Sequence, residues 1–391
     1  MITIEKALEL VEQNLPEVFP TKMKLTDTLD LVLAEDIFSP IFMPPFRQSA
    51  MDGYAVHFSG EKTYNIIGEV KAGDGYNPIL GKGEGVRIFT GAAVPDTADT
   101  VIIQEHVTFE DQKITLHKDV EPLQNIRPKG EQIEEGSLAL EKGSKLTPAT
   151  IGFLAGLGIT EVLVYPKPSI AIVTTGNELI TPGEPLTYGK IYESNGVMLY
   201  NALLKSGYNE VEIFKVKDDY KSTRDLLDDI ISGYDIVLIT GGISVGDYDF
   251  VGKALKELKV QEIFYKVKQK PGKPLFFGRK DSKTIFALPG NPASTLSCFY
   301  IYVIPALAKL SANGFQMLER TKANSLSNYV VKGDRSQFLK AYLKDNKVEF
   351  LEGQSSAMLH TFAMANALIY VKPEDSPIGI GNEVEVIHLP K

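Results

Sequence analysis

Between residues 168 and 312, strand segments alternate with helix segments, and this alternation constrains the fold more than any other feature of the sequence. The strand segments SIAIVTTG and YDIVLITGG are apolar throughout, whereas SNGVMLYNALLKSG and STRDLLDDIISG have helical periodicity. A strand that is apolar on both faces must be buried on both faces, which is typical of a sheet between two layers of helices. The pattern therefore predicts a three-layer α/β domain around a central parallel or mixed sheet.

The residues outside this segment have a different pattern. Residues 46–135 are mostly β, with a hairpin whose turn lies near Glu110–Gln112. Residues 320–391 also alternate apolar and polar residues, and the hairpin signal at Asp345-Asn346 predicts a small β-barrel or sandwich. A chain of 391 residues exceeds the size of one compact core. The expected fold class is therefore a multidomain α/β protein.

Composition and charge argue against several classes of protein. The net charge of −9 argues against nucleic-acid binding over the whole surface. The single cysteine, Cys298, rules out an internal disulfide framework and is expected to be a buried core residue. The N-terminal residues lack the pattern of a signal peptide, and no apolar run reaches the length of about 18 residues that a membrane span needs. We therefore expect a cytoplasmic protein that does not span a membrane.

Three strands of the α/β segment end in loops of unusual content, TTGNEL, TGGISVGDYDF and ALPGNPAS. In open α/β sheets, ligands bind beyond the carboxyl ends of the strands, and the following helices favour anions at their N-termini. Gly241 and Gly242 allow backbone N–H groups to approach a ligand, and Ser244 adds a hydroxyl donor. One such loop would be interpreted as a plain turn, but three at one edge favour a binding site.

Carboxylates follow the ends of these strands. Glu178, Asp218 and Asp249 come from three different strand ends, so they are expected to converge. Converging carboxylates repel each other unless a hard cation such as Mg²⁺ lies among them. The alternative is that they cap helices, which we favour for Asp219 but not for Asp218 or Asp249.

A basic segment, FYKVKQKPGKP, lies between two of these loops. If it is a strand, Lys266, Lys268 and Lys270 share one face. Lys273 follows a turn at Pro271-Gly272. Compact ammonium groups suit a tetrahedral oxyanion. The alternative is a solvated edge strand on which lysines discourage aggregation, but the position of the segment favours an anion site.

Taken in order, the motifs of this chain resemble those of the molybdopterin molybdenumtransferase family, which is related to the E domain of gephyrin. The resemblance covers essentially the full length of the chain. It rests on PPFRQSAMDGYA, RIFTGAAVP, DTVIIQE, NIRPKGE, TTGNEL, SNGVML, TGGISVGDYDF, KPGKP and LPGNP. TGGISVGDYD alone also resembles the related adenylyltransferase domain, so the combination of motifs identifies the family.

The resemblance implies an architecture of four domains. These are an elongated N-terminal domain of residues 1–45 and 136–166, an inserted β domain of residues 46–135, an α/β molybdopterin-binding domain of residues 167–312, and a C-terminal β-barrel domain of residues 320–391. It also implies a homodimer whose active cleft lies between the α/β domain of one subunit and the inserted β domain of the other.

The implied reaction inserts molybdate into adenylylated molybdopterin with Mg²⁺ as cofactor and releases AMP. A separate molybdopterin adenylyltransferase is expected to supply the substrate, and no nucleic acid or membrane is an expected partner. A substrate with a phosphoanhydride and an incoming tetrahedral dianion needs lysines, backbone donors and a metal held by carboxylates. The interpretation from the residues therefore agrees with the reaction that the family implies.

Family roles fall on particular residues of this chain. The implied catalytic residues are Asp52, Thr90, Glu178, Asp218, Asp249, Lys266 and Lys270, of which Glu178, Asp218 and Asp249 would hold the metal. The implied substrate-binding residues are Gly241, Gly242, Ser244, Lys273, Pro274, Pro292, Lys340 and Ser356. From the residues alone, Asp52 and Thr90 would be turn residues.

Two positions depart from the family pattern. The family often has arginine where this chain has Lys340, and aspartate where it has Gln132. Lysine keeps the charge but lacks the bidentate fork of arginine, so oxyanion binding at that position would be weaker or rearranged.

Two other functions remain open at this point. A molybdopterin adenylyltransferase would need only the α/β domain, so the long N-terminal region argues against it. A scaffold without catalytic activity, as the gephyrin E domain can be, would not need intact lysine and carboxylate motifs.

Overall fold

The computed structural model describes residues 1–217, 219–243 and 250–390, and it divides into two compact units. The first unit contains Met1–Thr21, Asp30–Val32 and Tyr165–Lys391, and the second contains Lys22–Leu29 and Leu33–Val164. Of the sequence predictions, Asp218, Ser244 and Asp249 lie outside the described residues. The four-domain division implied by the family remains a prediction.

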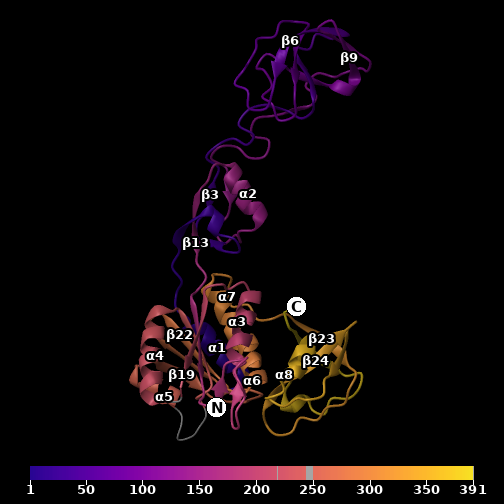
Figure 1. Cartoon of the computed structure of the whole chain (residues 1–391). Helices are drawn as coiled ribbons and strands as arrows, with labels where there is room; N and C mark the ends of the chain where they lie inside the picture. The colour runs from indigo at the N-terminus through magenta and orange to yellow at the C-terminus, as the bar shows by residue number, and fades with distance from the viewer. Residues whose placement is uncertain (218, 244–249, 391) are drawn as a thin grey trace. The chain divides into compact units, whose positions relative to one another are not determined.

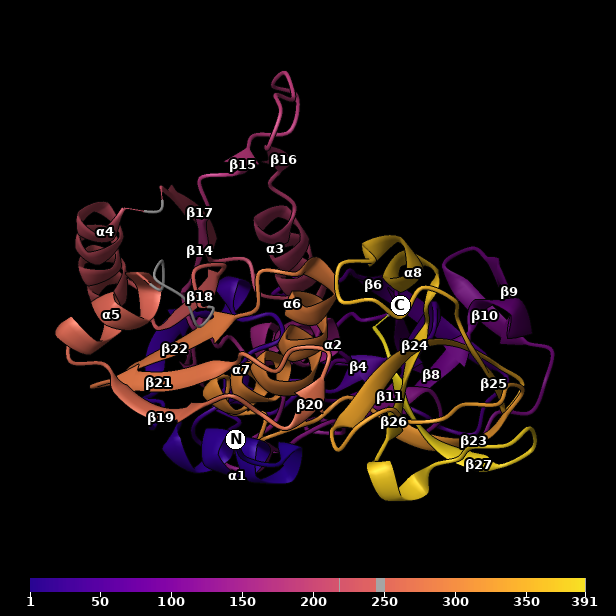
Figure 2. The same cartoon turned by 90° about the horizontal axis from the view of Figure 1, so that it is seen from below.

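The first unit contains a six-stranded mixed sheet (Figure 1), and its strand order β17-β14-β18-β22-β21-β19 can be followed in Figure 2. Strands β17, β14, β18 and β22 are parallel, whereas β21 is antiparallel to both of its neighbours. The bounds are β14 Ile170–Thr175, β17 Val211–Val216, β18 Ile236–Thr240, β19 Gln261–Tyr265, β21 Phe276–Lys280 and β22 Lys283–Leu288. The central sheet predicted from the sequence is confirmed, and the three loops follow strands of its parallel part.

Helices cover both faces of this sheet, which confirms the three-layer prediction (Figure 2). One face packs on α1 Ile4–Asn14, α3 Asn195–Lys205 and the continuous run of α6 Pro292–Cys298, a π-turn and α7 Ile304–Leu310. The other face packs on α4 Tyr220–Gly233 and α5 Phe250–Glu257. Helix α1 belongs to this unit because Ile4, Ala7 and Val11 are buried in the same core as the sheet residue Ile172.

The helix run Pro292–Leu310 is long and apolar enough to cross a membrane by length and composition alone, but 78% of it is buried inside the protein. This burial is that of a core helix. Cys298 lies within it and is buried, as predicted, and burial raises the pKa of its thiol to about 12. Asp219 caps α4, because its carboxylate accepts a hydrogen bond from the backbone N–H of Ser222 at 2.9 Å, which confirms the alternative interpretation of this residue.

The C-terminal part of the first unit is a closed five-stranded β-barrel, as predicted. Its strands follow the order β24-β25-β23-β27-β26, and β26 pairs again with β24 to close the ring. The bounds are β23 Arg320–Ser325, β24 Ser336–Lys344, β25 Lys347–Phe350, β26 Ala367–Val371 and β27 Glu383–His388, with α8 Leu359–Met364 between β25 and β26. The predicted hairpin turn is confirmed by φ angles of 46° at Asp345 and 59° at Asn346.

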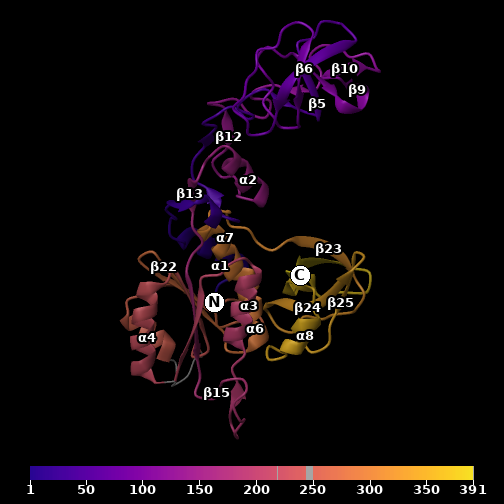
Figure 3. The ribbon, with the colours of Figure 1, turned by 45° about the horizontal axis from the view of Figure 1, so that its top comes forward.

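A two-residue strand from the α/β sequence joins this barrel. Strand β20, Gln269–Lys270, pairs in parallel with the start of β24, with Lys270 opposite Gln337. A second short pair, β15 Leu179–Ile180 and β16 Ile191–Tyr192, lies at the base of a segment that extends away from the α/β sheet (Figure 3).

The second unit is built mainly from β-strands. A six-stranded sheet has the order β8-β5-β7-β6-β10-β9, with β5 Gly53–Val56, β6 Thr63–Val70, β7 Glu84–Ile88, β8 Thr100–Ile103, β9 Val107–Glu110 and β10 Lys113–Leu116. Shorter elements that lie wholly or partly in this unit are β1 Thr21–Lys24, β2 Val32–Leu33, β3 Ile37–Phe38, β4 Gln48–Ser49, β11 Ile126–Arg127, β12 Leu138–Leu140, β13 Glu161–Tyr165 and α2 Pro148–Gly156. The predicted hairpin between β9 and β10 is confirmed, and Thr147 caps the start of α2.

Candidate functional site

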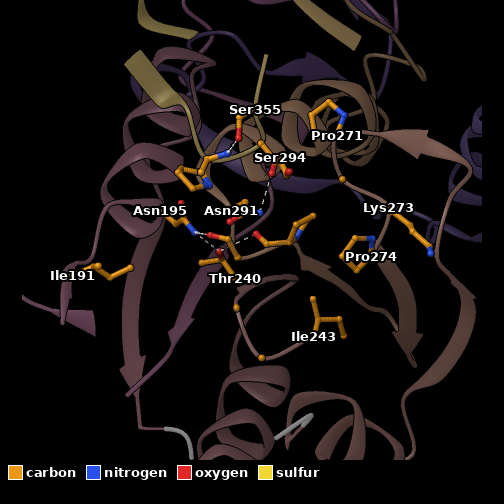
Figure 4. A pocket seen from close by; sticks show the side chains of 18 of the residues that line it. Ile191, Asn195, Thr240, Ile243, Pro271, Lys273, Pro274, Asn291, Ser294 and Ser355 are labelled. Atoms are coloured by element: carbon orange, nitrogen blue, oxygen red, sulfur yellow. Dashed lines mark hydrogen bonds between the residues drawn. The ribbon is translucent and has the colours of Figure 1, made fainter. Parts of the chain in front are cut away.

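A cavity of about 990 Å³ lies at the carboxyl ends of β14, β18 and β22, where the sequence placed the site (Figure 4). The three predicted loops contribute Thr175 and Glu178, Gly241 and Gly242, and Pro289 to Asn291 to its lining. Two further walls come from the KPGKP loop and from barrel residues 354–357. The volume is at the upper end of the range for small-molecule sites.

Gly241 and Gly242 line the cavity, and both have backbone angles that favour glycine. Their φ angles are 89° and 61°. A Cβ atom on Gly241 would lie 2.4 Å from the carbonyl oxygen of Thr175, on the neighbouring strand β14. The turn after β18 therefore requires glycine in order to pass close to β14 and form this edge of the cavity.

Asn195, at the start of α3, connects two of the loops from the cavity wall. Its amide nitrogen donates to Thr240 Oγ1 at 2.8 Å and to the carbonyl oxygen of Gly290 at 2.7 Å (Figure 4). The carbonyl of Gly290 can only accept, so the orientation of the amide is determined. The amide oxygen Oδ1 is buried and has no hydrogen-bond partner among the described residues. A buried acceptor of this kind is suited to a donor group on a ligand.

Lys270 and Lys273 both line the cavity, together with Pro274 and Pro292. Gln269 holds the loop that carries the two lysines. Its amide nitrogen donates to the carbonyl oxygen of Gly272 at 3.1 Å, and its amide oxygen accepts from the hydroxyl of Tyr302. Gln269 is fully buried. The two ammonium groups are thus presented by a backbone that is anchored in the core.

The expectation that Lys266, Lys268 and Lys270 share one strand face is wrong. Strand β19 ends at Tyr265, and Lys266 has a φ of 70°, which an extended strand does not adopt. Lys266 is not among the residues that line the cavity, and its ammonium lies 4.6 Å from the centre of the Tyr265 ring. Lys268 pairs instead with Asp334 at 3.1 Å.

Among the residues that the structure describes, two carboxylates line the cavity, Glu178 and Glu193. They lie beside the paired strands β15 and β16, because the carbonyl of Glu178 accepts from Ile191 N–H at 2.8 Å and Glu193 N–H donates to Ile180 at 2.9 Å. Glu193 is buried, and its carboxylate accepts from the N–H of Gly196 at 2.7 Å. The sequence reasoning missed Glu193, although it directly precedes the recognised SNGVML motif.

No cluster of three or more metal-binding side chains occurs within residues 1–217, 219–243 and 250–390. Mg²⁺ in phosphate-binding sites is usually held by one or two carboxylates together with substrate oxygens and water. Glu178 and Glu193 are oxygen donors of the right kind, so the described lining residues fit such an ion.

The barrel contributes Arg335 and Ser355–Ala357 to the cavity lining. Ser356 accepts a hydrogen bond from Asn291 Nδ2 at 2.9 Å, which brings the predicted serine to the LPGNP loop. Arg335 donates to the carbonyl oxygen of Gln269 at 3.3 Å. Sequence reasoning missed Arg335, because its position depends on the pairing of β20 with β24.

Lys340 does not line the cavity, although the resemblance implied that it binds substrate. It is 4% exposed on β24, and its ammonium donates to three backbone carbonyl oxygens. Gln132, the other departure from the family, lies in the second unit, where its side chain is exposed.

In the second unit, the structure brings Asp52 and Thr90 together. Asp52 Oδ1 accepts from the backbone N–H of Thr90 at 2.7 Å and from its hydroxyl at 2.8 Å. The Thr90 N–H is the main cause of a lowered pKa of Asp52, followed by the Thr90 hydroxyl, and Arg87 contributes through its charge. Asp52 is therefore held as an exposed, ionised carboxylate.

Replacing Thr90 by valine is expected to raise the pKa of Asp52 only part of the way to its ordinary value. The substitution removes the hydroxyl donor but keeps the backbone N–H, which is the larger cause of the lowered pKa. The pKa is measured by titrating the Asp52 carboxyl carbon by NMR, with Thr63→Val on β6 as the matched control. An unchanged pKa in Thr90→Val would show that the hydroxyl bond does not persist in solution.

Three family models together match nearly the whole chain. They are described as "MoeA N-terminal region (domain I and II)" at residues 2–158, "Probable molybdopterin binding domain" at residues 171–309 and "MoeA C-terminal region (domain IV)" at residues 322–389. The second of these models covers β18, β22, all of β14 but its first residue, and the three loops at the ends of these strands, whereas the barrel residues that line the cavity lie within the third.

Curated relatives and solved structures are similar over the same length. The molybdopterin molybdenumtransferase of Haemophilus influenzae is 34% identical, covering 99% of this chain and 98% of the relative. That of Staphylococcus epidermidis is 31% identical, with 99% and 95% covered. The crystal structure of the molybdopterin biosynthesis moea protein from Pyrococcus horikosii has a TM-score of 0.81 at 31% identity and covers 99% of both chains.

Proposed function

Because the chain belongs to the molybdopterin molybdenumtransferase family, a group of transferases in molybdenum-cofactor biosynthesis, we propose that its cavity inserts molybdate into adenylylated molybdopterin and releases AMP. The observation that carries the proposal is the charge of the cavity wall. Lys270, Lys273 and Arg335 line the same cavity as Glu178 and Glu193. Cations for an oxyanion and oxygen donors for a metal thus occur in one site.

The chemistry needs these groups in one place. Molybdate is a tetrahedral dianion, and the phosphoanhydride of the other substrate is also anionic, so positive side chains must offset the repulsion between them. In the proposed reaction, the two dithiol sulfurs of the pterin form Mo–S bonds to molybdate, and one molybdate oxygen leaves with the two thiol protons as water. A water molecule also adds to a phosphorus atom of the anhydride, the P–O bond to the bridging oxygen breaks, and AMP departs while the other phosphate stays on the molybdopterin. The lysines would stabilise the charge that develops on the phosphoryl oxygens, which is the kind of stabilisation that contributes most in such sites.

We propose that Glu178 and Glu193 hold Mg²⁺ together with substrate oxygens, with Asp218 and Asp249 as the further ligands that the family implies. When bound, Mg²⁺ would neutralise part of the anhydride charge and polarise its phosphorus. The buried amide oxygen of Asn195 would accept a hydrogen bond from an N–H or O–H group of the pterin nucleotide. The glycines of the Thr240–Gly242 turn would let the backbone approach this ligand.

We further propose that the enzyme acts in the cytoplasm as a homodimer and receives its substrate from a separate molybdopterin adenylyltransferase. The family architecture supports the dimer, because it brings the inserted domain of one subunit to the α/β domain of the other. In that arrangement Asp52 and Thr90, which form a preorganised pair in the second unit, would complete the cavity of the partner subunit.

The purified chain tests the proposed function directly. It is incubated with adenylylated molybdopterin and Mg²⁺, with and without molybdate, and AMP is measured by chromatography while the cofactor is measured by activating a cofactor-free molybdoenzyme. We expect AMP release that depends on molybdate and is accompanied by cofactor formation. ATP consumption with free molybdopterin would instead support an adenylyltransferase, and pterin binding without turnover would support a scaffold.

A further inference from the structure

Lys340 uses all of its side-chain donors within the protein. It lies on β24 and is 4% exposed. Its ammonium donates to the carbonyl oxygens of Gly353, Ser355 and Met358 at 2.7, 3.1 and 3.0 Å. A lysine ammonium has three donors and no acceptor. No donor is therefore left for an anion in the cavity.

The backbone of Lys340 is tied to the same loop. Its N–H donates to Gln354 Oε1 at 2.9 Å, and its carbonyl accepts from Gln354 Nε2 at 2.8 Å. The Gln354 amide also donates to the carbonyl of Leu351 at 2.7 Å. Residues 351–358 are thus fastened to one position of the barrel through both the main chain and the side chain of Lys340.

This loop carries part of the cavity wall. Ser355, Ser356 and Ala357 line the cavity. From the other side, the loop is held by the LPGNP segment, because Ala293 N–H donates to the Ser356 carbonyl at 3.0 Å and Asn291 donates to the Ser356 hydroxyl at 2.9 Å. The loop that carries Ser356 is therefore held by hydrogen bonds from Lys340 on one side and from the LPGNP segment on the other.

Arg335 is the barrel cation that lines the cavity. It is only partly buried, and one of its five donors is used by the carbonyl of Gln269. The guanidinium therefore keeps donors for a ligand, and its planar fork suits an oxyanion.

We propose that Lys340 is a positioning residue that holds loop 353–358 and thereby Ser356, and that Arg335 is the barrel residue that contacts the molybdate oxyanion. This inference rests on the proposed function, and it reverses the role that the family resemblance implied for Lys340. Withdrawing the ammonium toward the cavity would break three charge-assisted hydrogen bonds to part-buried carbonyl groups, each of which contributes to stability. Burial also lowers the pKa of Lys340, as expected for a side chain enclosed by the loop.

Two measurements separate a positioning residue from a ligand. The first is binding of molybdate to the full chain by titration calorimetry at two salt concentrations, because a direct charge contact weakens with salt. The second is amide hydrogen exchange of residues 353–358. The variants are Lys340→Met, Lys340→Arg and Arg335→Met, with Lys344→Met, an exposed lysine on the same strand, as the matched control for loss of a charge.

We expect Arg335→Met to weaken molybdate binding about 10-fold or more and to flatten its salt dependence, with exchange unchanged. Lys340→Met should speed exchange in the loop about 10-fold or more and keep the salt dependence of the wild type. Lys340→Arg should not restore protection, because a planar guanidinium cannot replace an ammonium among three converging carbonyls. Lys344→Met should change neither quantity.

A double-mutant cycle tests whether Lys340 acts through Ser356. The KM for molybdate is measured for Lys340→Met, Ser356→Ala and the double variant. We expect the fold increase in KM of the double variant to be smaller than the product of the fold increases of the two single variants. Fold increases in KM that simply multiply would overturn the proposal. The proposal would also be overturned, and Lys340 would be a ligand, if Lys340→Met left the amide exchange of the loop unchanged and flattened the salt dependence of molybdate binding. Absence of molybdate binding by the wild type would count against the proposed function, while the exchange result would still decide the role of Lys340.

Discussion

Replacing Lys270 by methionine is expected to lower kcat/KM for molybdenum insertion by about 100-fold or more. Lys270 is exposed in the wall of the cavity, and its backbone is fixed by the pairing of β20 with β24. Loss of one preorganised group that stabilises developing charge on oxygen costs about 10²–10³ in rate. The methionine keeps the length of the side chain, so the change reports on charge more than on packing.

Steady-state AMP release at saturating and limiting molybdate measures this effect. Lys280→Met is the matched control, because Lys280 lies on β21 outside the cavity lining and pairs with Asp228 at 3.7 Å. It should remain within about two-fold of the wild type, as expected for a surface ion pair. A Lys270→Met enzyme with normal kcat/KM would remove the lysine loop from the proposed mechanism.

Replacing Gly241 by alanine is expected to destabilise the first unit by about 3 kcal/mol. A left-handed backbone costs alanine about 1–2 kcal/mol, and here the new Cβ would also lie 2.4 Å from the Thr175 carbonyl oxygen. The contact is with backbone, so no side chain can move aside. The turn would have to shift away from β14, and the cavity edge would shift with it.

The midpoint of thermal unfolding measures the destabilisation. Gly314→Ala is the matched control, since Gly314 has a φ of 74° in the same unit but open space where a Cβ would be. The Gly314→Ala variant should lower the midpoint only by the cost of the backbone conformation. The midpoint of Gly241→Ala should be clearly lower than that of Gly314→Ala. Equal midpoints for the two variants would mean that the turn after β18 relaxes without cost.

The α/β domain was predictable from sequence because its signals are local. Unbroken apolar strands and amphipathic helices repeat over residues 168–312, and the loops with glycine and proline follow the strand ends directly. The rule that ligands bind at those ends then located the cavity without any knowledge of long-range contacts. Strand β21 was missed because its apolar part, Leu275 to Gly278, is short and stands only a few residues before β22.

Three of the errors at the site depend on contacts between distant parts of the chain. Lys266 leaves the expected strand because Val267 forms a bridge with Ile2, near the start of the chain. Arg335 reaches the cavity because β24 pairs with β20, more than sixty residues earlier. Lys340 does not line the cavity, because its ammonium is bound by three carbonyl groups of the loop after β25. No periodicity in the sequence encodes these three events.

Strand β20 also affects how the enzyme can change. Its two residues pair with strand β24 of the barrel, and the loop that follows places Lys273 and Pro274 in the lining of the cavity. A substitution in the barrel interior that tilts β24 would therefore move the backbone of the candidate site, even with every side chain that lines the cavity intact. We expect barrel variants to show altered kinetics before they show altered folding, and directed evolution toward other oxyanions to select changes inside the barrel as well as in the cavity.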